Sequence, residues 1–366
     1  MEHKSQMEVM VAWEELQNTY KDKKIFVTGH TGFKGSWLLA VLDLLSAKVK
    51  GFSLAPENEP SLYSMINGSE LCDSVIADVL DYNILEREII EFQPDYIFHL
   101  AAQSLVRKSY VNPRDTFEVN AMGTANILDS VRRLPNKCQV IVITTDKVYE
   151  NMEKDYAYIE DDKLGGFDPY SSSKACAELV AYSYKSSFFH PDNYSTHGKS
   201  IATARSGNVI GGGDWAEDRI VPDMIRAFLA NEVLKVRNPK SVRPWQHVLE
   251  PLAGYLHLGC QMVKDPIKYA DSYNFGPMEN DKLTVEELIQ IAAKKWGSGS
   301  YEVEKNTDNP HEAGLLQLNI QKAKVVLNWE PNMQSSEAIE KTVTWYKNYN
   351  ENPLELTQNQ IKEYFS

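Results

Sequence analysis

The sequence predicts an α/β fold in which a doubly wound parallel sheet is followed by a smaller mixed α/β domain. Three observations lead to this prediction. From Lys23 onward, short apolar runs alternate with amphipathic stretches of helical length, an alternation typical of parallel strands joined by helices. A glycine-rich turn directly follows the first apolar run. After Asn208 the segments become shorter and richer in Pro and Asn, which indicates a change of architecture.

The strands and helices follow from local composition and periodicity. Apolar, β-branched and aromatic runs between turn residues predict strands at 25–27, 49–54, 74–77, 96–100, 140–143 and 201–204. Apolar residues at helical spacing predict helices at 36–45, 80–92, 116–133, 171–188, 249–262 and 284–295. In the first of these helices Trp37, Leu38, Val41, Leu42 and Leu45 share one face.

These patterns divide the chain into domains. Residues 1–22 form a lead-in, either a short amphipathic helix or a loose tail, without the continuous apolar run of a signal peptide or a membrane anchor. Residues 23–208 form the sheet domain, and residues 244–275 partly return to it. Residues 209–243 and 276–366 form the smaller domain.

Composition and charge exclude several classes of function. The 366 residues are 43% hydrophobic and 24% charged, which is ordinary for a globular protein with a sizeable core. The net charge of −13 argues against a nucleic-acid partner, so an anionic ligand would require a local basic pocket. The four cysteines lie far apart and form no CxxC pair. Neither a metal site nor a disulfide framework is therefore expected, and a cytoplasmic location is predicted.

The first strand leads into the turn Thr28-Gly29-His30-Thr31-Gly32-Phe33-Lys34-Gly35, and a helix follows. Glycines in such a turn let backbone amides approach a pyrophosphate at the helix N-terminus. The GxxGxxG spacing resembles that of the short-chain dehydrogenase/reductase superfamily, which implies a Rossmann-type sheet with a bound nicotinamide dinucleotide. The side chains of His30 and Lys34 would place positive charge near the cofactor phosphates. The residues expected at the cofactor here are Gly29, His30, Gly32, Phe33, Lys34 and Gly35.

The rest of the cofactor site is less fully specified. An acidic residue at the end of the second strand would hold the adenosine ribose hydroxyls, but this strand ends in Ser53-Leu54 and the first acid is Glu57. The residues alone therefore leave NAD and NADP open. Asp78-Val79, after the third strand, resemble the pair that contacts adenine in this superfamily, or else belong to an ordinary helix cap. Ala101-Ala102 supply small residues where the backbone passes close to the dinucleotide.

Tyr170 and Lys174 are the most specific sign of a reaction centre. A spacing of four residues places both side chains on one helix face. A lysine ammonium beside a phenol lowers the phenol pKa, which would let Tyr170 take a proton from a sugar hydroxyl. Thr145, at the end of the fifth strand, would hydrogen-bond the reacting C4 oxygen. The alternative is a surface tyrosine and a solvated lysine.

Asp146 and Lys147 follow Thr145 at the edge of the sheet where ligands bind in such folds. Elimination of water from a sugar needs an acid and a base, and the resembling hexose dehydratases typically carry Thr-Asp-Glu at this place. Here lysine replaces the glutamate. Lys147 would therefore act as the C5 base in a neutral form, or stay charged and stabilise an enolate. An exposed pair at a strand end is the third possibility.

Longer segments add to this pattern, at 27–35, 101–103, 106–107, 145–147, 168–171, 207–215, 237–239, 243–251 and 274–277. Together they resemble the CDP-glucose 4,6-dehydratases, a subgroup of the NAD-dependent sugar-nucleotide dehydratases, over nearly all of the chain. The resemblance implies a redox-neutral lyase reaction. Hydride moves from C4 to NAD, water leaves across C5 and C6, and the hydride returns to C6 to give CDP-4-dehydro-6-deoxyglucose. It also implies a homodimer in which the helices after Asp115 and after Tyr170 pack across a two-fold axis.

The three arginines expected at the substrate lie in the second part of the chain. The resembling enzymes hold the nucleotide there, and a guanidinium fork suits a diphosphate. Surface arginines in a loop-rich domain are the alternative, and the cytosine base follows from the resemblance alone. The residues expected at the substrate are Gln103, Asn208, Arg219, Arg237, Arg243 and His247.

Four other functions stay open at this point. A sugar-nucleotide 4-epimerase would share the fold, the cofactor and the Tyr170–Lys174 pair, but would not need Asp146 and Lys147. A 4,6-dehydratase could act on another nucleotide-glucose. A non-catalytic dinucleotide-binding regulator would need none of the catalytic side chains, and a net NADPH-dependent reductase would consume its cofactor.

Overall fold

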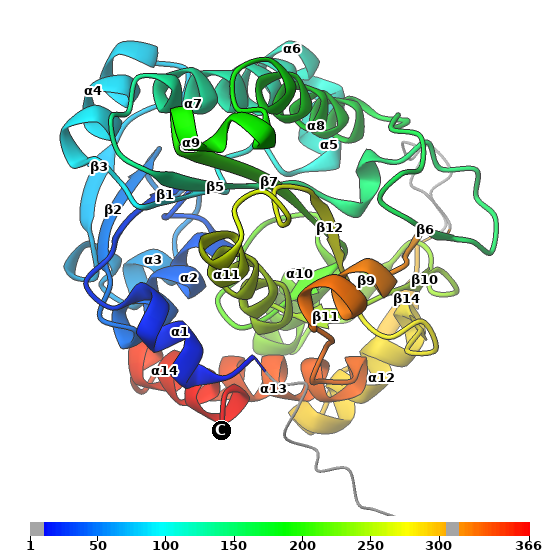
Figure 1. The fold of residues 1–366 in the computed structure, drawn as a ribbon. Coiled ribbons are helices and arrows are strands. Elements are labelled where there is room, and N and C mark those ends of the chain that lie inside the picture. The colour runs from blue at the N-terminus through cyan, green and yellow to red at the C-terminus, as the bar shows by residue number, and fades with distance from the viewer. Residues whose placement is uncertain (1–10, 305–314) are drawn as a thin grey trace, which may run out of the picture.

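The computed structural model describes residues 11–304 and 315–366. Seven parallel strands form one sheet in the order β12-β7-β5-β4-β1-β2-β3 (Figure 1). The α/β class and the parallel sheet predicted from the sequence are confirmed. The strands are β1 (Lys24–Thr28), β2 (Lys48–Ser53), β3 (Asp73–Ile76), β4 (Tyr96–His99), β5 (Cys138–Ile143), β7 (Lys199–Ser206) and β12 (Ser272–Phe275).

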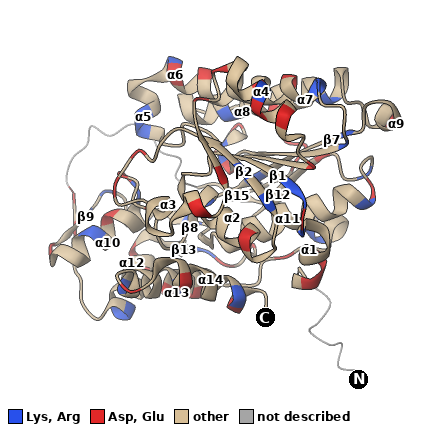
Figure 2. Cartoon of the chain, turned by 90° about the vertical axis from the view of Figure 1, so that its left-hand side faces the viewer, with Lys and Arg blue, Asp and Glu red and all other residues tan. Residues whose placement is uncertain are grey.

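Helices cover both faces of this sheet, which explains why the central strands read as continuous apolar runs. On one face lie α4 (Tyr82–Phe92), α7 (Gly123–Arg132) and α8 (Pro169–Ser187); on the other lie α1 (Trp13–Tyr20), α2 (Phe33–Leu44) and α11 (Leu249–Lys264) (Figures 1 and 2). Alternate residues of β1 serve the two layers. Ile25 and Val27 pack with α2 and α11, whereas Phe26 packs with α4 and α7.

The predicted helix at 116–133 is divided in the structure. It consists of α6 (Pro113–Phe117), a π-helical turn at Glu118–Met122 and α7. The π turn contains Asn120, whose side-chain amide donates to the backbone oxygen of Gln103 and to the hydroxyl of Ser173 on α8. A π turn is a common feature of helices near functional sites, and here it joins the loop after β4 to the helix of Tyr170.

The later part of the chain forms a loop-rich layer below the sheet. Its helices are α10 (Ile220–Ala230), α12 (Val285–Trp296), α13 (Ser335–Asn348) and α14 (Pro353–Tyr364). The sequence analysis did not predict α10, α13 or α14. The last helix, α14, packs against α2 of the sheet domain. Among the described residues, the short strands outside the seven-stranded sheet form four pairs. These are β8 (Val209–Ile210) with β11 (Gln246–His247), β9 (Leu234–Val236) with β14 (Tyr301–Val303), β10 (Val242–Arg243) with β13 (Leu283–Thr284), and β6 (Ala157–Tyr158) with β15 (Gln317–Leu318).

The segments 244–275 and Trp13–Tyr20 pack on the sheet side of the molecule. Within 244–275, α11 covers the sheet and β12 extends it as an edge strand beside β7. Of the predicted lead-in, residues 1–10 lie outside the described residues, and α1 packs against α11 through a hydrogen bond from the Tyr20 hydroxyl to the Leu256 backbone oxygen of 2.6 Å. Within the described part of the chain, none of the helices has the combination of length and apolar character needed to cross a bilayer.

Candidate active site

A large cavity lies at the carboxyl ends of β1, β4, β5 and β7. From β1 the chain continues to β2 on one side, whereas β4 lies on the other side, so this is the point where the strand order reverses. Ligands of open α/β sheets bind at that point. The volume of about 1230 Å³ exceeds that of a usual single-ligand pocket. The cavity therefore has room for a dinucleotide and a second ligand.

The glycine turn forms one wall of this cavity and brings backbone close to backbone. Gly29 has a φ of +75°, and a Cβ atom there would lie 2.7 Å from the Ala101 backbone nitrogen. A Cβ atom on Gly35 would lie 2.1 Å from the Gly29 backbone oxygen. No other residue type fits either position, so the turn keeps its backbone amides accessible at the N-terminus of α2. This cradle fits a dinucleotide pyrophosphate.

His30 departs from the sequence prediction. Its ring is fully buried beneath the turn, where Nε2 lies 2.7 Å from the Ser74 hydroxyl and the ring lies directly over Gly51. Burial lowers the pKa of His30 to about 4, so the ring is neutral near pH 7. The prediction that His30 brings positive charge to the cofactor phosphates is wrong, because its side chain points into the sheet instead of into the cavity.

Lys34 lies in the cavity on α2, and its ammonium group donates to the Ser206 hydroxyl at 2.8 Å. Burial lowers the pKa of Lys34 to about 7, and the charges of Arg219 and Lys174 lower it further, whereas Asp146 opposes them. Lys147 adds a smaller repulsion, so four cations lie close enough to repel one another. An anionic ligand bound among them would stabilise the charged form of Lys34.

The side of the cavity next to β2 and β3 has no acid in the usual ribose position. The Ser53 hydroxyl at the end of β2 lies 2.9 Å from the Thr31 hydroxyl. The first acid after β2 that lines the cavity is Glu57, which is paired with Lys108 of α5 (Val106–Val111). Asp78 lines the cavity and also accepts the backbone amide of Leu80 at 2.9 Å. Both roles considered for Asp78 are therefore compatible with its position. Val79, Ala101, Ala102, Gly32 and Phe33 line the cavity as well.

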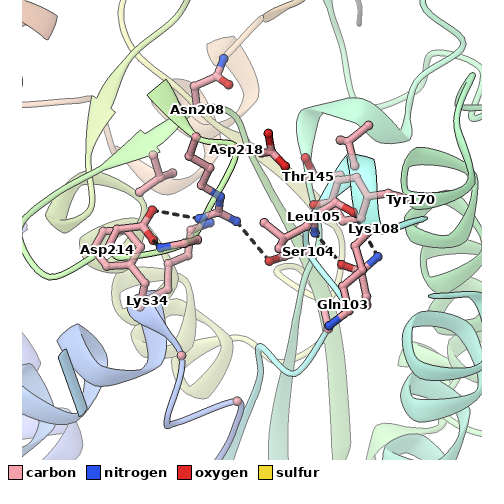
Figure 3. Close-up of a pocket in the computed structure, with 18 of the residues that line it drawn as sticks. Lys34, Gln103, Ser104, Leu105, Lys108, Thr145, Tyr170, Asn208, Asp214 and Asp218 are labelled. Carbon is pink, nitrogen blue, oxygen red and sulfur yellow. Dashed lines mark hydrogen bonds and ion pairs between the residues drawn. The ribbon is translucent and has the colours of Figure 1, made fainter. Parts of the chain in front are cut away.

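Five predicted residues line the opposite wall, where β5 ends and α8 begins: Thr145, Asp146, Lys147, Tyr170 and Lys174. Figure 3 shows Thr145 and Tyr170 on this wall. The Thr145 hydroxyl donates to the Asp146 carboxylate at 2.9 Å, and the Lys147 ammonium lies 3.8 Å from the same oxygen. Asp146 is 1% exposed and packs against Gly207 of the next strand end. An acid and a lysine therefore lie beside the tyrosine, and the acid is buried whereas the lysine side chain is 32% exposed.

The electrostatics of Tyr170 differ from the sequence prediction. Burial raises the pKa of Tyr170, and the charge of Lys147 is the main opposing influence, followed by the Thr145 hydroxyl. The sequence analysis expected this influence from Lys174. The Lys174 ammonium instead donates to the Ile143 backbone oxygen at 3.1 Å, and burial lowers its own pKa to about 8. Lys147 is therefore the lysine that favours the phenolate form of Tyr170 in this structure.

The cavity wall formed by the later part of the chain contains the three arginines that were predicted at the substrate. Arg219 donates to Asp214 at 3.0 Å and, across the cavity, to the Ser104 hydroxyl at 3.1 Å (Figure 3). Arg237 lies 3.9 Å from Asp218, which also accepts from Arg107 at 3.0 Å. Arg243 and Asn208 line the same wall. The two parts of the chain are thus connected over the cavity by ion pairs and hydrogen bonds.

Two predicted substrate residues do not offer free groups to a ligand. His247 is fully buried, contacts Trp37 edge to face with ring centroids 5.6 Å apart, and is absent from the cavity lining. Burial lowers the pKa of His247 to about 3. Gln103 lines the cavity, but its amide nitrogen donates to the Leu105 backbone oxygen and to the Thr116 hydroxyl, and its amide oxygen accepts the Leu105 amide. Gln103 therefore shapes the loop after β4.

Sequence reasoning missed several residues of this site. Ser206, which bonds Lys34, and Tyr255, which donates to Ser206 at 2.7 Å, carry no recognisable motif. Arg107 and Asp214 do lie in segments that were singled out for their resemblance. Their pairing partners, Asp218 and Arg219, come from a loop whose path only the structure shows. In the sequence, only their position at a strand end or in a matched segment could have indicated that these residues belong to the site.

Comparisons with known proteins agree with this geometry. The family model for GDP-mannose 4,6 dehydratase matches residues 26–342. The chain is 43% identical over 352 residues to a CDP-glucose 4,6-dehydratase of Salmonella typhimurium, covering 96% of this chain and 98% of that protein. Among solved structures, a UDP-glucuronic acid 4-epimerase from Bacillus cereus with UDP-glucuronic acid and NAD superposes with a TM-score of 0.75 at 23% identity, covering 89% and 99% of the two chains. A dTDP-glucose 4,6-dehydratase from Bacillus anthracis with NAD gives a TM-score of 0.73 at 23% identity, covering 91% and 99%.

Proposed function

Because the chain belongs to the GDP-mannose 4,6-dehydratase family, we propose that it is a lyase that converts CDP-glucose to CDP-4-dehydro-6-deoxyglucose and water. The observation that carries the reaction type is the position of Asp146 and Lys147 beside Tyr170 on one cavity wall. An epimerase needs a base at C4 only, whereas a dehydratase also needs an acid and a base for C5 and C6. The 43% identical relative supports CDP-glucose as the substrate.

NAD is proposed as the cofactor. When bound, it supplies the acceptor for the C4 hydride and the donor that returns hydride to C6. Gly29, Gly32 and Gly35 would hold its pyrophosphate through backbone amides, with Lys34 as the nearby cation. Near the ribose, Ser53 and the loop that contains Glu57 would replace the missing acid.

Tyr170 is proposed to take the proton from the C4 hydroxyl as hydride leaves C4. Its phenol is buried, so a proton acceptor must be stabilised by neighbouring charge. Lys147 and Thr145 provide that stabilisation in this structure. The Thr145 hydroxyl, which donates to Asp146 here, would turn to donate to the C4 oxygen when the substrate binds. Lys174, on the same helix face, would join this group once a ligand fills the cavity.

Elimination of water is assigned to Asp146 and Lys147. Asp146, in its protonated form, would give its proton to the C6 hydroxyl, which leaves as water when the C6–O bond breaks. Lys147 would take the C5 proton in its neutral form, or in its charged form stabilise the enolate oxygen at C4. The side chain of Lys147 is 32% exposed, so solvent exchange at C5 can be observed directly.

The substrate diphosphate is proposed to bind between Arg219, Arg237 and Arg243. The first two are held by carboxylates of Asp214 and Asp218 and so are oriented before a ligand binds. Asn208, at the end of β7, would reach the diphosphate or the sugar (Figure 3). Guanidinium groups from one wall would thereby orient the glucose toward Tyr170 on the other.

One experiment tests the reaction and the substrate together. The protein is incubated in deuterated water with CDP-, UDP-, dTDP- or GDP-glucose, with NAD far below substrate, and the products are followed by NMR. The proposal expects a 4-keto-6-deoxy sugar from CDP-glucose, with deuterium at C5 and no net reduced cofactor. A C4-epimerised sugar that keeps its C6 hydroxyl and protium at C5 would show an epimerase instead.

A homodimer is proposed through the face of α8 and the π-helical turn Glu118–Met122. Apolar side chains on this face are unusually exposed, with Leu179 at 55%, Tyr182 at 66% and Met122 at 53%. Clustered exposed apolar side chains of this kind mark association surfaces. Tyr182→Glu should convert the dimer to a monomer in sedimentation. Val325→Glu, which changes an exposed apolar residue on the π-helical turn Ala323–Leu327, should not. A wild-type monomer at assay concentrations would refute this proposal.

A further inference from the structure

A buried ion pair lies directly behind the catalytic wall. Glu178 is one helical turn beyond Lys174 on α8 and is 3% exposed, and its partner Arg205 on β7 is also 3% exposed. The pair is bidentate: Arg205 Nε donates to Glu178 Oε1 at 3.0 Å and an Nη donates to Oε2 at 2.9 Å. Neither residue lines the cavity. Two charges are therefore buried in the core beside a site that they do not touch.

Every remaining polar group of this pair is bonded to a segment of the active site or its support. Glu178 accepts the Thr144 hydroxyl, and also that of Thr203 at 2.7 Å. The second Nη of Arg205 donates to the Tyr149 hydroxyl at 2.8 Å and to the Glu160 backbone oxygen at 2.9 Å. Tyr149 in turn donates to Asn274 of β12 at 2.8 Å.

These contacts hold both ends of one short segment. Thr144 immediately precedes Thr145, and Tyr149 follows the turn at Asp146–Val148. The three residues assigned to the reaction, Thr145, Asp146 and Lys147, lie between the two anchored residues. Reacting groups have to be held within about 0.5 Å of their productive positions, and bonded partners behind them provide this.

We propose that Glu178, paired with Arg205, is a positioning residue for the dehydration: it fixes the segment 144–149 against α8 and places a negative charge one turn behind Lys174. This inference rests on the proposed function, because it assigns a role relative to the reacting residues. A merely structural pair would stabilise the fold without affecting the ionisation of the active site.

The charge of Glu178 has a separate consequence for Lys174. Burial lowers the pKa of Lys174 to about 8, and the Glu178 carboxylate raises it. The other groups that face Lys174 are Lys34 from α2, which repels it, and His99 from β4, which is neutral because burial lowers its pKa to about 3. Removing the carboxylate charge therefore lowers the pKa of Lys174, and the ammonium form is lost at a lower pH.

The test compares Glu178→Gln with Glu250→Gln in the full-length protein. Glu250 is a control for the loss of a buried carboxyl group without a cationic partner among the ion pairs of the described residues. It is bonded to the amides of Asn332 and Met333 and to the Tyr364 hydroxyl, and it lies away from the cavity. For each variant, kcat and KM for CDP-glucose, the pH–rate profile and the midpoint of thermal unfolding are measured. Glu178→Gln should lower kcat by about tenfold or more with KM changed by less than about threefold. Its loss of activity at high pH should begin at a lower pH than in the wild type.

Thr144→Val is the second variant, because Glu178→Gln leaves Arg205 buried without a charged partner and could fail to fold. Thr144→Val keeps both charges and removes only the bond to the strand end. It should lower kcat while leaving the basic limb of the profile in place. Wild-type kcat in this variant would overturn the proposed positioning on its own.

The outcomes separate the inference from the proposed function. A wild-type enzyme that dehydrates none of the four nucleotide-glucoses would refute the proposed function. An active wild type whose Glu178→Gln variant keeps its kcat and pH profile, or loses no more activity than Glu250→Gln, would refute the positioning role alone. A tenfold loss with a shifted basic limb, confined to Glu178→Gln, would support it.

Discussion

Gly207 offers the sharpest perturbation of the proposed acid. A Cβ atom built on Gly207 would lie 2.8 Å from the Asp146 Oδ2 atom, whereas its next neighbours, Asp146 Cγ and Pro244 Cγ, are at 3.4 and 3.8 Å. Gly207 does not have a positive φ, so alanine fits its backbone without strain. Gly207→Ala therefore changes one contact, and that contact is with the carboxylate assigned to C6.

The magnitude follows from the distance that has to be gained. Ordinary contacts of a Cβ atom begin at 3.4 Å, so the Asp146 carboxylate would move by about half an ångström. Because a displacement of 1 Å in an active site costs about 10²-fold in rate, we expect kcat to fall by about tenfold. The carboxylate can move because only Thr145 and Lys147 contact it among the hydrogen bonds and ion pairs of the described residues.

The assay follows two steps separately. Oxidation at C4 is measured in a single turnover by the absorbance of reduced nicotinamide, and elimination is measured by formation of the 4-keto-6-deoxy product. In Gly207→Ala, reduced cofactor should form at the wild-type rate and accumulate, because the later step is slowed. Gly276→Ala is the control, since its Cβ atom would meet Leu318 and Ile320 at 3.5 and 3.6 Å, which are ordinary contacts. Equal kcat values for the wild type and both variants would refute the role assigned to Asp146.

Four further predictions follow from the same structure. Tyr170→Phe should block the first hydride transfer, because the C4 hydroxyl loses its base; normal build-up of reduced cofactor would contradict this. Lys147→Ala should keep C4 oxidation but slow exchange of the C5 hydrogen with deuterated solvent, and exchange at the wild-type rate would exclude Lys147 from that step. Gly29→Ala should weaken NAD binding by at least about tenfold in calorimetry, because its Cβ atom meets backbone at 2.7 Å and its φ is +75°; an unchanged affinity would disprove the assigned cradle. Burial raises the pKa of Glu250 from 4.5 to about 7, so the folded protein retains this proton longer than the unfolded chain, and the free energy of unfolding should fall by about 3 kcal/mol as the pH rises from 4.5 to 7. Glu250→Gln should remove this part of the pH dependence in urea unfolding, and an identical slope in both proteins would show that Glu250 is not its source.

The sheet could be predicted from the sequence because its strands are buried on both faces. Such strands appear as uninterrupted apolar runs, as in Val140 to Ile143, and helices of regular period separate them. The helices α10, α13 and α14 were not predicted, although α10 and α13 also bury one face. They follow a region of glycine and proline turns, where no regular alternation of strands and helices indicates the next element. For α14, the partner α2 is more than 300 residues distant in the chain, and local pattern does not indicate it.

The same limit explains the two histidines. Sequence position placed His30 in the glycine turn and His247 in a matched segment, but neither position fixes the direction of the side chain. His30 fills the space above Gly51, and His247 packs on Trp37, because both rings lie on the inner side of their backbone. By contrast, Tyr170 and Lys174 share a helix whose start is fixed by Asp168, which caps it by accepting the Ser171 amide at 2.9 Å. Helical spacing therefore predicted their common face.

The charge of the site also needed the structure. An acidic protein that binds an anion was expected to have a basic pocket, yet the cavity contains acids such as Asp146, Asp214 and Asp218 among its cations. These acids are paired with cations: Asp214 orients Arg219, and Asp218 joins Arg107 to Arg237. Burial lowers the pKa of Lys34, and repulsion by the cations near it lowers it further. The pairs therefore fix the direction of each guanidinium group. They leave part of the positive charge to be neutralised by the phosphates of the ligands. The affinity for an anion thus comes from the arrangement of the charges and not from their sum.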